Sequence, residues 1–302
     1  FIRRMIMSIE LFELRTAIIG ENFPIKRAIP QRELRNIGHW VFLDHAGPTV
    51  FKTGEDVDVG AHPHIGLQTF SWLLQGEIIH NDSLGSHQIM SPYQINLMTA
   101  GKGIVHTELS HPDSKELHLA QLWIALPKEK ETIEPDFKHY PKLPHIDHDD
   151  YEAHVLVGEY DGHISPVEMH SPLSALDIKG KKDITITLPL NPNFEYGLLP
   201  LEGEMTAEEV QMNDNTLAYI PAGTTSITLK LHKDSRALLI GGEPIEHPPL
   251  MWWNFVAWEQ ETIEDALKDW ENHSDRFPEV PYPGKSERLI APPLTGKLKS
   301  HK

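Results

Sequence analysis

The sequence of 302 residues predicts an all-β protein made of two similar units. Short apolar and β-branched runs recur about every 8–12 residues between turn signals, a spacing typical of antiparallel barrels and sandwiches. A proline-rich, charged segment divides the chain near its middle. Leu201-Glu202-Gly203-Glu204 also resembles Leu74-Gln75-Gly76-Glu77, and both follow an apolar run, which indicates a repeated β unit.

The two halves each supply a series of strand candidates. In the first half these are residues 39–43, 67–74, 78–80, 86–90, 95–99, 104–109 and 118–126. In the second half residues 183–188 alternate strictly, and further short runs continue to residue 240. We therefore expect an N-terminal barrel over residues 8–135, a linker over 136–150, a C-terminal barrel over 151–275 and a loose tail over 276–302.

One helix is predicted, close to the end of the second unit. Thr262 is a plausible N-cap, and Asp265 stands where the second residue of a capping box would be. Ile263, Ala266, Leu267 and Trp270 form an apolar stripe at helical spacing, so we expect a helix that packs on the C-terminal barrel.

Composition excludes several classes of function. The chain has no cysteine, which excludes disulfides, thiolate zinc sites and Fe–S clusters. Its net charge of −17 disfavours direct contact with nucleic acid or anionic membranes. No apolar run is long enough to span a bilayer and no signal peptide is evident, which predicts a cytoplasmic protein. Because chains do not normally begin with Phe, we expect the natural start at Met5 or Met7.

Two pairs of coordinating residues stand in the first half. His62 and His64 are separated by one residue, as are His106 and Glu108. Residues i and i+2 of a strand point to the same face, so the four side chains converge if the two strands are neighbours. Imidazoles and a carboxylate suit a divalent transition metal, and four ligands leave positions of an octahedron open for substrate. The spacing alone supports only a metal-binding protein.

Histidines elsewhere are interpreted as less specific. His145-Ile146-Asp147-His148-Asp149-Asp150 is interpreted as a solvated charged run rather than a metal site. His80 and His87 flank a hairpin turn and are expected to face solvent, whereas His111 and His118 are candidates for the rim of the site.

The wider sequence resembles the pirin family. The motifs that carry the resemblance are Gly60 to Gly66, which contains His-Pro-His, the Asp82–Gly85 turn, Met98–Glu108, Leu122-Trp123 and Gly241–Pro244. The resemblance implies a bicupin, two stacked double-stranded β-helix (jelly-roll) barrels. It also implies one metal ion in the N-terminal barrel, usually non-haem iron, held by His62, His64, His106 and Glu108. Iron(II) is therefore expected, although Mn, Co, Ni, Cu or Zn also suit these ligands.

Two positions depart from the family pattern. Gln68 stands where the family often has an acidic residue, so the carboxylate role is expected to fall to Glu108. Ile65 replaces a basic residue and is expected to remove a positive charge beside the metal. The second half has no His-x-His at the corresponding strand, so its barrel is expected to bind no metal.

The resemblance implies two alternative functions. The first is a pirin-like quercetin 2,3-dioxygenase that cleaves a flavonol or related enol with dioxygen, in which Glu108 accepts the proton of the substrate hydroxyl. The alternative is an iron-dependent, redox-sensing regulatory protein that acts through a protein partner. The true substrate, the metal, the oligomeric state and the role of residues 276–302 do not follow from the sequence.

Overall fold

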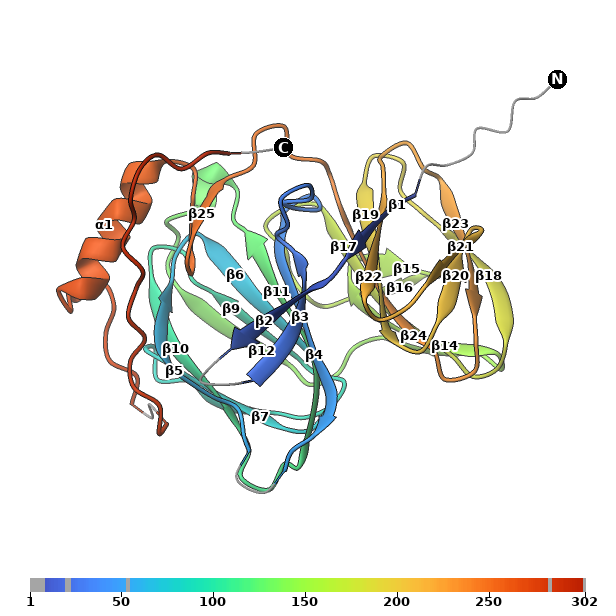
Figure 1. Cartoon of the computed structure of the whole chain (residues 1–302), viewed down its shortest axis with the longest axis horizontal. Coiled ribbons are helices and arrows are strands. Elements are labelled where there is room, and N and C mark those ends of the chain that lie inside the picture. The colour runs from blue at the N-terminus through green and yellow to red at the C-terminus, as the bar shows by residue number, and fades with distance from the viewer. Residues whose placement is uncertain (1–8, 20–22, 53–54, 282–283, 301–302) are drawn as a thin grey trace. The chain divides into compact units, whose positions relative to one another are not determined.

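The structure, a computed structural model, describes residues 9–19, 23–52, 55–281 and 284–300 (Figure 1). The expected natural start at Met5 or Met7 lies outside these residues. Apart from the single turn of 3₁₀-helix η1 (Lys128–Lys130) and the helix α1 (Gln260–Glu271), the regular elements of the described chain are strands. The predicted all-β class with one short helix is confirmed. No helix in the described part of the chain is long and apolar enough to cross a membrane.

The chain divides into two compact units, and segments distant in sequence contribute to each. The N-terminal barrel comprises residues 16–35, 41–142 and those from Glu246 onward. Of the described residues, the C-terminal barrel comprises 9–15, 36–40 and 143–245. These boundaries differ from the expected ones of 8–135, 136–150 and 151–275. The expected linker contains strands β12 (Asp136–Tyr140) and β13 (His145–Asp147), because Phe137 and Ile146 alternate with polar neighbours.

The N-terminal barrel contains two larger sheets and one short hairpin. The seven-stranded sheet has the order β12, β9 (Ile95–Thr99), β6 (Leu67–Gln75), β11 (Glu116–Ala125), β4 (Trp40–Val50), β3 (Phe23–Ile29) and β2 (Arg15–Ile19). The four-stranded sheet has the order β5 (Asp58–His64), β10 (Ile104–Ser110), β7 (Ile78–Asp82) and β8 (His87–Met90). The hairpin joins β25 (Leu250–Trp252) to β26 (Phe255–Ala257).

The C-terminal barrel repeats this plan. Its seven-stranded sheet has the order β1 (Glu10–Glu13), β22 (Thr216–Ile220), β19 (Glu195–Glu202), β24 (Arg236–Gly242), β17 (Leu173–Gly180), β14 (Tyr151–Val157) and β13. Its four-stranded sheet has the order β18 (Ile184–Pro189), β23 (Ser226–Leu231), β20 (Met205–Ala207) and β21 (Val210–Met212). A small ribbon pairs β15 (Glu159–Tyr160) with β16 (His163–Ile164). The repeated β unit that the sequence indicated is therefore present.

The helix α1 belongs to the N-terminal barrel, not to the C-terminal barrel as expected. Its apolar stripe is buried as predicted, and it forms one core cluster with Ile65, Val105 and Phe255. The helix begins at Gln260, and the N-cap position is Glu259, which makes no side-chain capping bond. The predicted capping role of Thr262 is wrong, because the chain is already helical there.

The segment after α1 lies along strand β5. The backbone N–H groups of Lys285 and Ser286 donate to the Asp58 carboxylate, at 2.9 and 3.2 Å. The Leu289 N–H donates to the carbonyl oxygen of Ala61 at 2.9 Å. This part of the expected loose tail thus covers the outer side of the four-stranded sheet (Figure 1).

Candidate metal centre

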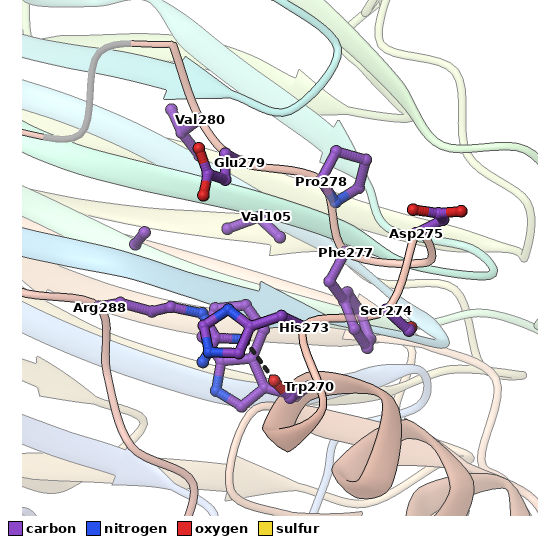
Figure 2. Close-up of a pocket in the computed structure, with 11 residues that line it drawn as sticks. Val105, Trp270, His273, Ser274, Asp275, Phe277, Pro278, Glu279, Val280 and Arg288 are labelled. Atoms are coloured by element: carbon purple, nitrogen blue, oxygen red, sulfur yellow. Dashed lines mark hydrogen bonds between the residues drawn. The ribbon is translucent and has the colours of Figure 1, made fainter.

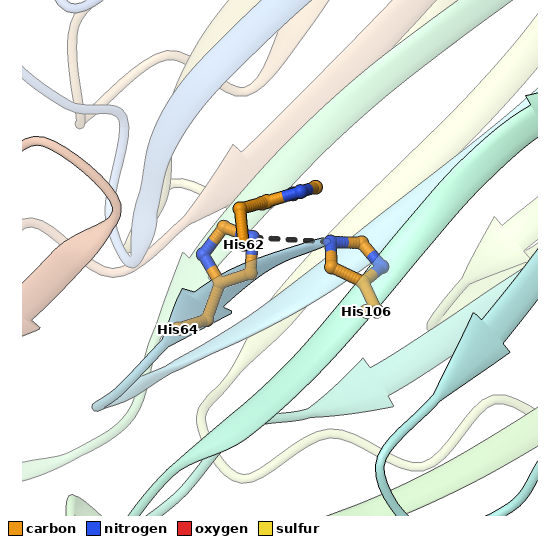
Figure 3. A group of neighbouring side chains, drawn as sticks. All are labelled: His62, His64 and His106. Atoms are coloured by element: carbon orange, nitrogen blue, oxygen red, sulfur yellow. Dashed lines mark hydrogen bonds between the residues drawn. The ribbon is translucent and has the colours of Figure 1, made fainter. Parts of the chain in front are cut away.

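Three histidines converge inside the N-terminal barrel. Strands β5 and β10 are antiparallel neighbours, and their register places His106 opposite His62. His64 shares a face with His62, so all three rings meet, as Figure 3 shows. One ring nitrogen from each lies within 4.8 Å of the others, and His64 Nε2 is 3.2 Å from His106 Nε2. The structure therefore brings together three of the four residues predicted from sequence.

Hydrogen bonds define how two of these rings are held. His62 Nδ1 donates to the Gly60 carbonyl at 2.8 Å, and His64 Nδ1 donates to the Asn254 carbonyl at 3.0 Å. A carbonyl oxygen can only accept, so the hydrogen of each neutral ring stands on Nδ1. The lone pair of Nε2 is then free to bind a metal ion, as is common for histidine ligands whose other nitrogen meets a carbonyl.

Burial keeps these imidazoles neutral. His62, His64 and His106 are each no more than 5% exposed. Burial lowers the pKa of His62 to about 4, although the Gly60 carbonyl partly opposes this. Burial and the neighbouring rings lower the pKa of His64 and of His106 well below the ordinary value. Neutral imidazole is the form that binds metal, so the centre is prepared for binding at neutral pH.

The donor set fits a divalent transition metal. At Zn–N distances near 2.0–2.1 Å, adjacent nitrogen ligands stand roughly 3.0–3.4 Å apart. The separation of 3.2 Å between His64 Nε2 and His106 Nε2 falls in this range. The arrangement thus fits a bound ion, whereas the identity of the ion does not follow from imidazole ligands.

Glu108 stands apart from the three rings. It lies two residues after His106 on β10 and faces the same side, opposite His80 of β7. A register shift between His106 and Glu108 against β5 places Glu108 opposite Val59. Its carboxylate is not among the atoms that lie within 4.8 Å of one another. Burial raises the pKa of Glu108 to about 7.

Two buried polar residues near His106, His80 and Asp82, were not predicted from the sequence to lie at the site. His80 is 4% exposed rather than solvent-facing, and its Nδ1 is 3.4 Å from His106 Nδ1. Its Nε2 lies 2.8 Å from the Oδ2 atom of Asp82, which is fully buried. Burial alone would raise the pKa of Asp82, but the hydrogen bond and charge of His80 and the Ser86 N–H together lower it. The interpretation of His80 from sequence was wrong.

An aromatic pair lines the interior beside the histidines. The Trp123 ring lies 5.1 Å from the His64 ring and stacks on Phe42, with 4.0 Å between ring centroids. Trp123 pairs with Thr69 in the register of β11 and β6, so these side chains share the interior face. The interior beside the imidazoles is therefore aromatic and apolar.

The two departures from the family pattern lie away from the centre. Gln68 is next to Thr69 on β6 and so faces the opposite side, where it donates to Thr99 Oγ1 at 2.9 Å. Ile65 packs with Val105 in the core cluster beneath α1. Because neighbouring residues in a strand face opposite sides, Gln68 and Ile65 do not line the centre, and the expected effect of Ile65 on the charge beside the metal was wrong. The prediction that the carboxylate role falls to Glu108 is unaffected. His118 is also not a rim residue, since it is fully buried, 2.8 Å from His45.

A cavity of about 590 Å³ lies on the reverse face of the same strands (Figure 2). Its lining includes Ala61 and Val105, which alternate with His62 and His106, together with Trp270, Glu279 and Arg288. Because alternate residues face opposite sides, this cavity does not open on the imidazoles. It is therefore separate from the candidate metal centre.

Comparison with known proteins agrees with this architecture. The Pirin family matches residues 22–124, and the Pirin C-terminal cupin domain matches residues 175–277. A Pseudomonas aeruginosa protein, PA1205, is 45% identical over 94% of this chain and 90% of its own length; its name designates it provisionally as a quercetin 2,3-dioxygenase. A pirin-like protein of Caulobacter vibrioides is 34% identical over 89% of this chain and 95% of its own length.

A solved structure extends the likeness to three dimensions. The crystal structure of a quercetin 2,3-dioxygenase from Acinetobacter baumannii has a TM-score of 0.95 and 46% identity, and it covers 97% of this chain and 98% of its own. The predicted bicupin fold is confirmed by this similarity and by the cupin domain match. On sequence, fold and matched domains alike, the chain belongs to the pirin family.

Proposed function

We propose that this protein is a metal-dependent dioxygenase that cleaves a flavonol such as quercetin, with one divalent ion in the N-terminal barrel. The observation that carries the proposal is the convergence of His62, His64 and His106, whose ring nitrogens lie within 4.8 Å of one another. The relatives named as quercetin 2,3-dioxygenases support the enzymatic alternative over the regulatory one.

The three histidines would hold the ion through Nε2. Glu108 is the anionic ligand that we assign, although its carboxylate lies outside the cluster of ring nitrogens in the metal-free chain. Iron(II) is our first choice, and Mn, Co, Ni, Cu or Zn could replace it. A bound ion would supply Lewis acidity and, if redox-active, electron transfer to dioxygen. Trp123, whose ring lies 5.1 Å from the His64 ring, would contact the flat rings of the substrate.

Glu108 is the residue that we assign to proton transfer. Burial raises the pKa of Glu108 to about 7 in the metal-free chain, and a buried carboxylate is a stronger proton acceptor than an exposed one, which suits it to an acidic enol hydroxyl. Its place two residues after His106 puts it on the interior face, toward which a substrate at the histidines would lie. No other described carboxylate is assigned to this step.

The test uses the full chain reconstituted with iron(II). We expect consumption of dioxygen and loss of quercetin absorbance, and we expect both to be abolished in His62→Ala. Glu108→Gln keeps the side-chain shape but is a far weaker proton acceptor, so kcat should fall about 10²–10⁴-fold. If the wild-type protein consumes neither dioxygen nor quercetin and His62→Ala behaves identically, the proposal fails.

A further inference from the structure

The cavity on the outer side of β5 and β10 has the size and composition of a ligand-binding site. Its volume of about 590 Å³ lies in the range of small-molecule pockets, which are mostly apolar with a few polar groups. Ala61, Val105 and Phe277 supply apolar lining, and Arg288 reaches the cavity from the segment that lies along β5 (Figure 2). All of these residues belong to the N-terminal barrel.

Arg288 contributes to this lining a positive charge that no carboxylate neutralises. Its guanidinium lies over the Trp270 ring, with 3.1 Å from Cζ to the ring centroid, and one N–H group donates to the Trp270 carbonyl oxygen. Across the part of the chain that the structure describes, Arg288 forms no ion pair with an acidic side chain. Because a guanidinium has five N–H donors, most of them remain for a ligand.

A half-buried guanidinium without an acidic partner favours an anionic ligand. Burial lowers the pKa of Arg288, yet the group stays charged at neutral pH, and a charge removed from water needs a partner. A carboxylate satisfies the guanidinium through two parallel hydrogen bonds, and stacking on Trp270 holds the guanidinium plane in one orientation. The apolar lining beside it favours a flat hydrocarbon body on that carboxylate over an inorganic anion.

Two acidic side chains limit the charge of such a ligand. Asp275 and Glu279 also line the cavity, both are exposed, and within the described chain neither forms an ion pair with Arg288. Figure 2 shows Asp275 and Arg288 on opposite sides of Phe277. These carboxylates repel a second negative charge on a ligand, but they accept a hydrogen bond from a hydroxyl group. The lining therefore favours one negative charge together with a hydrogen-bond donor.

We propose that this cavity is a second ligand site, which binds a small hydroxylated aromatic acid with its carboxylate on Arg288 and its ring against Phe277 and Val105. The site does not depend on the metal centre, because Ala61 and Val105 face away from the imidazoles. A hydroxybenzoate has about ten non-hydrogen atoms, so we expect a Kd on the order of 0.1–1 mM.

The probe is 4-hydroxybenzoate, and its binding to the full chain is measured by isothermal titration calorimetry in a buffer without carboxylates. We expect saturable binding at one site. Arg288→Gln should weaken it about 10–100-fold, because a charge-assisted pair of hydrogen bonds is lost. Lys285→Gln is the matched control and should keep the wild-type affinity, because Lys285 lies on the same segment, pairs with Asp56 and does not line the cavity.

A second probe tests the limit on charge. Terephthalate replaces the hydroxyl group of 4-hydroxybenzoate with a second carboxylate, so it should bind about 5–10-fold more weakly than 4-hydroxybenzoate. Glu279→Gln removes one of the two repelling charges and should recover part of that loss, while the affinity for 4-hydroxybenzoate changes less. Inorganic phosphate at the same concentration should not compete with 4-hydroxybenzoate, because it has no apolar body.

Three results would overturn the proposal. These are the absence of saturable binding well above 1 mM, equal affinity of wild type and Arg288→Gln, and terephthalate or phosphate binding as tightly as 4-hydroxybenzoate. Should Arg288→Gln not fold, the indole ¹H–¹⁵N resonance of Trp270 in the wild-type protein decides. Trp270 lines the cavity, so its resonance should shift in proportion to occupancy, and a resonance that stays in place during the titration also overturns the proposal.

Discussion

The two four-stranded sheets share a strand order but differ in the chemistry of their interior faces. In the N-terminal barrel, the order β5-β10-β7-β8 places His62 opposite His106. In the C-terminal barrel, the same order is built by β18-β23-β20-β21, and Leu188 lies opposite Ile227. Leu188, Ile227 and Leu229 all belong to one apolar core. One scaffold thus serves either as a polar site or as a packed core, depending on the residues at alternate positions.

The outer faces of these sheets differ in the opposite sense. In the C-terminal barrel, Thr185 and Thr187 of β18 and Lys230 of β23 are exposed. In the N-terminal barrel, Val105 on the outer face packs beneath α1 in an apolar cluster. The sheet that carries the three histidines therefore buries apolar surface on its outer side. In the N-terminal barrel, a sheet with polar side chains on its interior face is thus stabilised by apolar packing on its outer face.

The largest expected effect concerns the packed interior of the C-terminal barrel. Leu229→Ala removes a fully buried side chain and should lower the free energy of unfolding by about 3 kcal/mol. Urea unfolding measures this change, and cobalt affinity at the other barrel should stay at the wild-type value. Ile164→Ala, at a side chain 69% exposed in the same barrel, is the control and should change stability by less than about 0.5 kcal/mol. Equal effects of both substitutions would contradict the comparison.

A smaller effect concerns a buried histidine of the C-terminal barrel. Burial, followed by the charges of His145 and Arg236, lowers the pKa of His154 to about 4. The unfolded chain therefore binds this proton first as the pH falls, so stability is lost from about pH 6.5 down to pH 4. His154→Gln should reduce that loss by about 2 kcal/mol. The free energies of unfolding of the wild type and of His154→Gln at pH 7, 5 and 4 test this prediction. An identical pH dependence in the two proteins would refute it.

The smallest effect concerns α1, the helix that packs on the sheet with the three histidines. Because the N-cap is Glu259 and Thr262 is already inside the helix, Thr262→Ala should change stability by less than about 0.5 kcal/mol. A true N-cap would cost about 1 kcal/mol on the same substitution. The change in stability, measured by thermal unfolding, shows which of these two values applies to Thr262→Ala. A loss of 1 kcal/mol or more would restore Thr262 as a cap.

Spacing along single strands was sufficient to predict the convergence of the histidines. His62, His64 and His106 follow from alternation once β5 and β10 are neighbours. His80 and Asp82 have the same i, i+2 spacing, but alternation does not tell an interior face from an exposed one when a strand lies beside a turn. The contact of Asn254 with His64 could not be predicted, because Asn254 accepts through its backbone carbonyl oxygen, a group that every residue type has.

The sequence also did not predict which barrel α1 packs on. The stripe of Ile263, Ala266, Leu267 and Trp270 shows that one side of the helix is buried, and this was confirmed. An apolar stripe does not specify which sheet covers it, so proximity in sequence suggested the wrong barrel. The division of the chain into compact units differs from the expected domain boundaries for the same reason, since the boundaries assigned each segment to the barrel nearest in sequence.

The hydrogen bond from His64 to Asn254 has a consequence for how the protein is made. His64 leaves the ribosome long before Asn254, and strands β14 to β24 of the C-terminal barrel are synthesised between them. The barrel that is translated first is therefore completed last, when the residues from Glu246 onward are released. The metal centre can reach its final hydrogen bonding only after synthesis has passed through the second barrel. A nascent chain halted at residue 245 would hold all three histidines but lack the acceptor that orients His64.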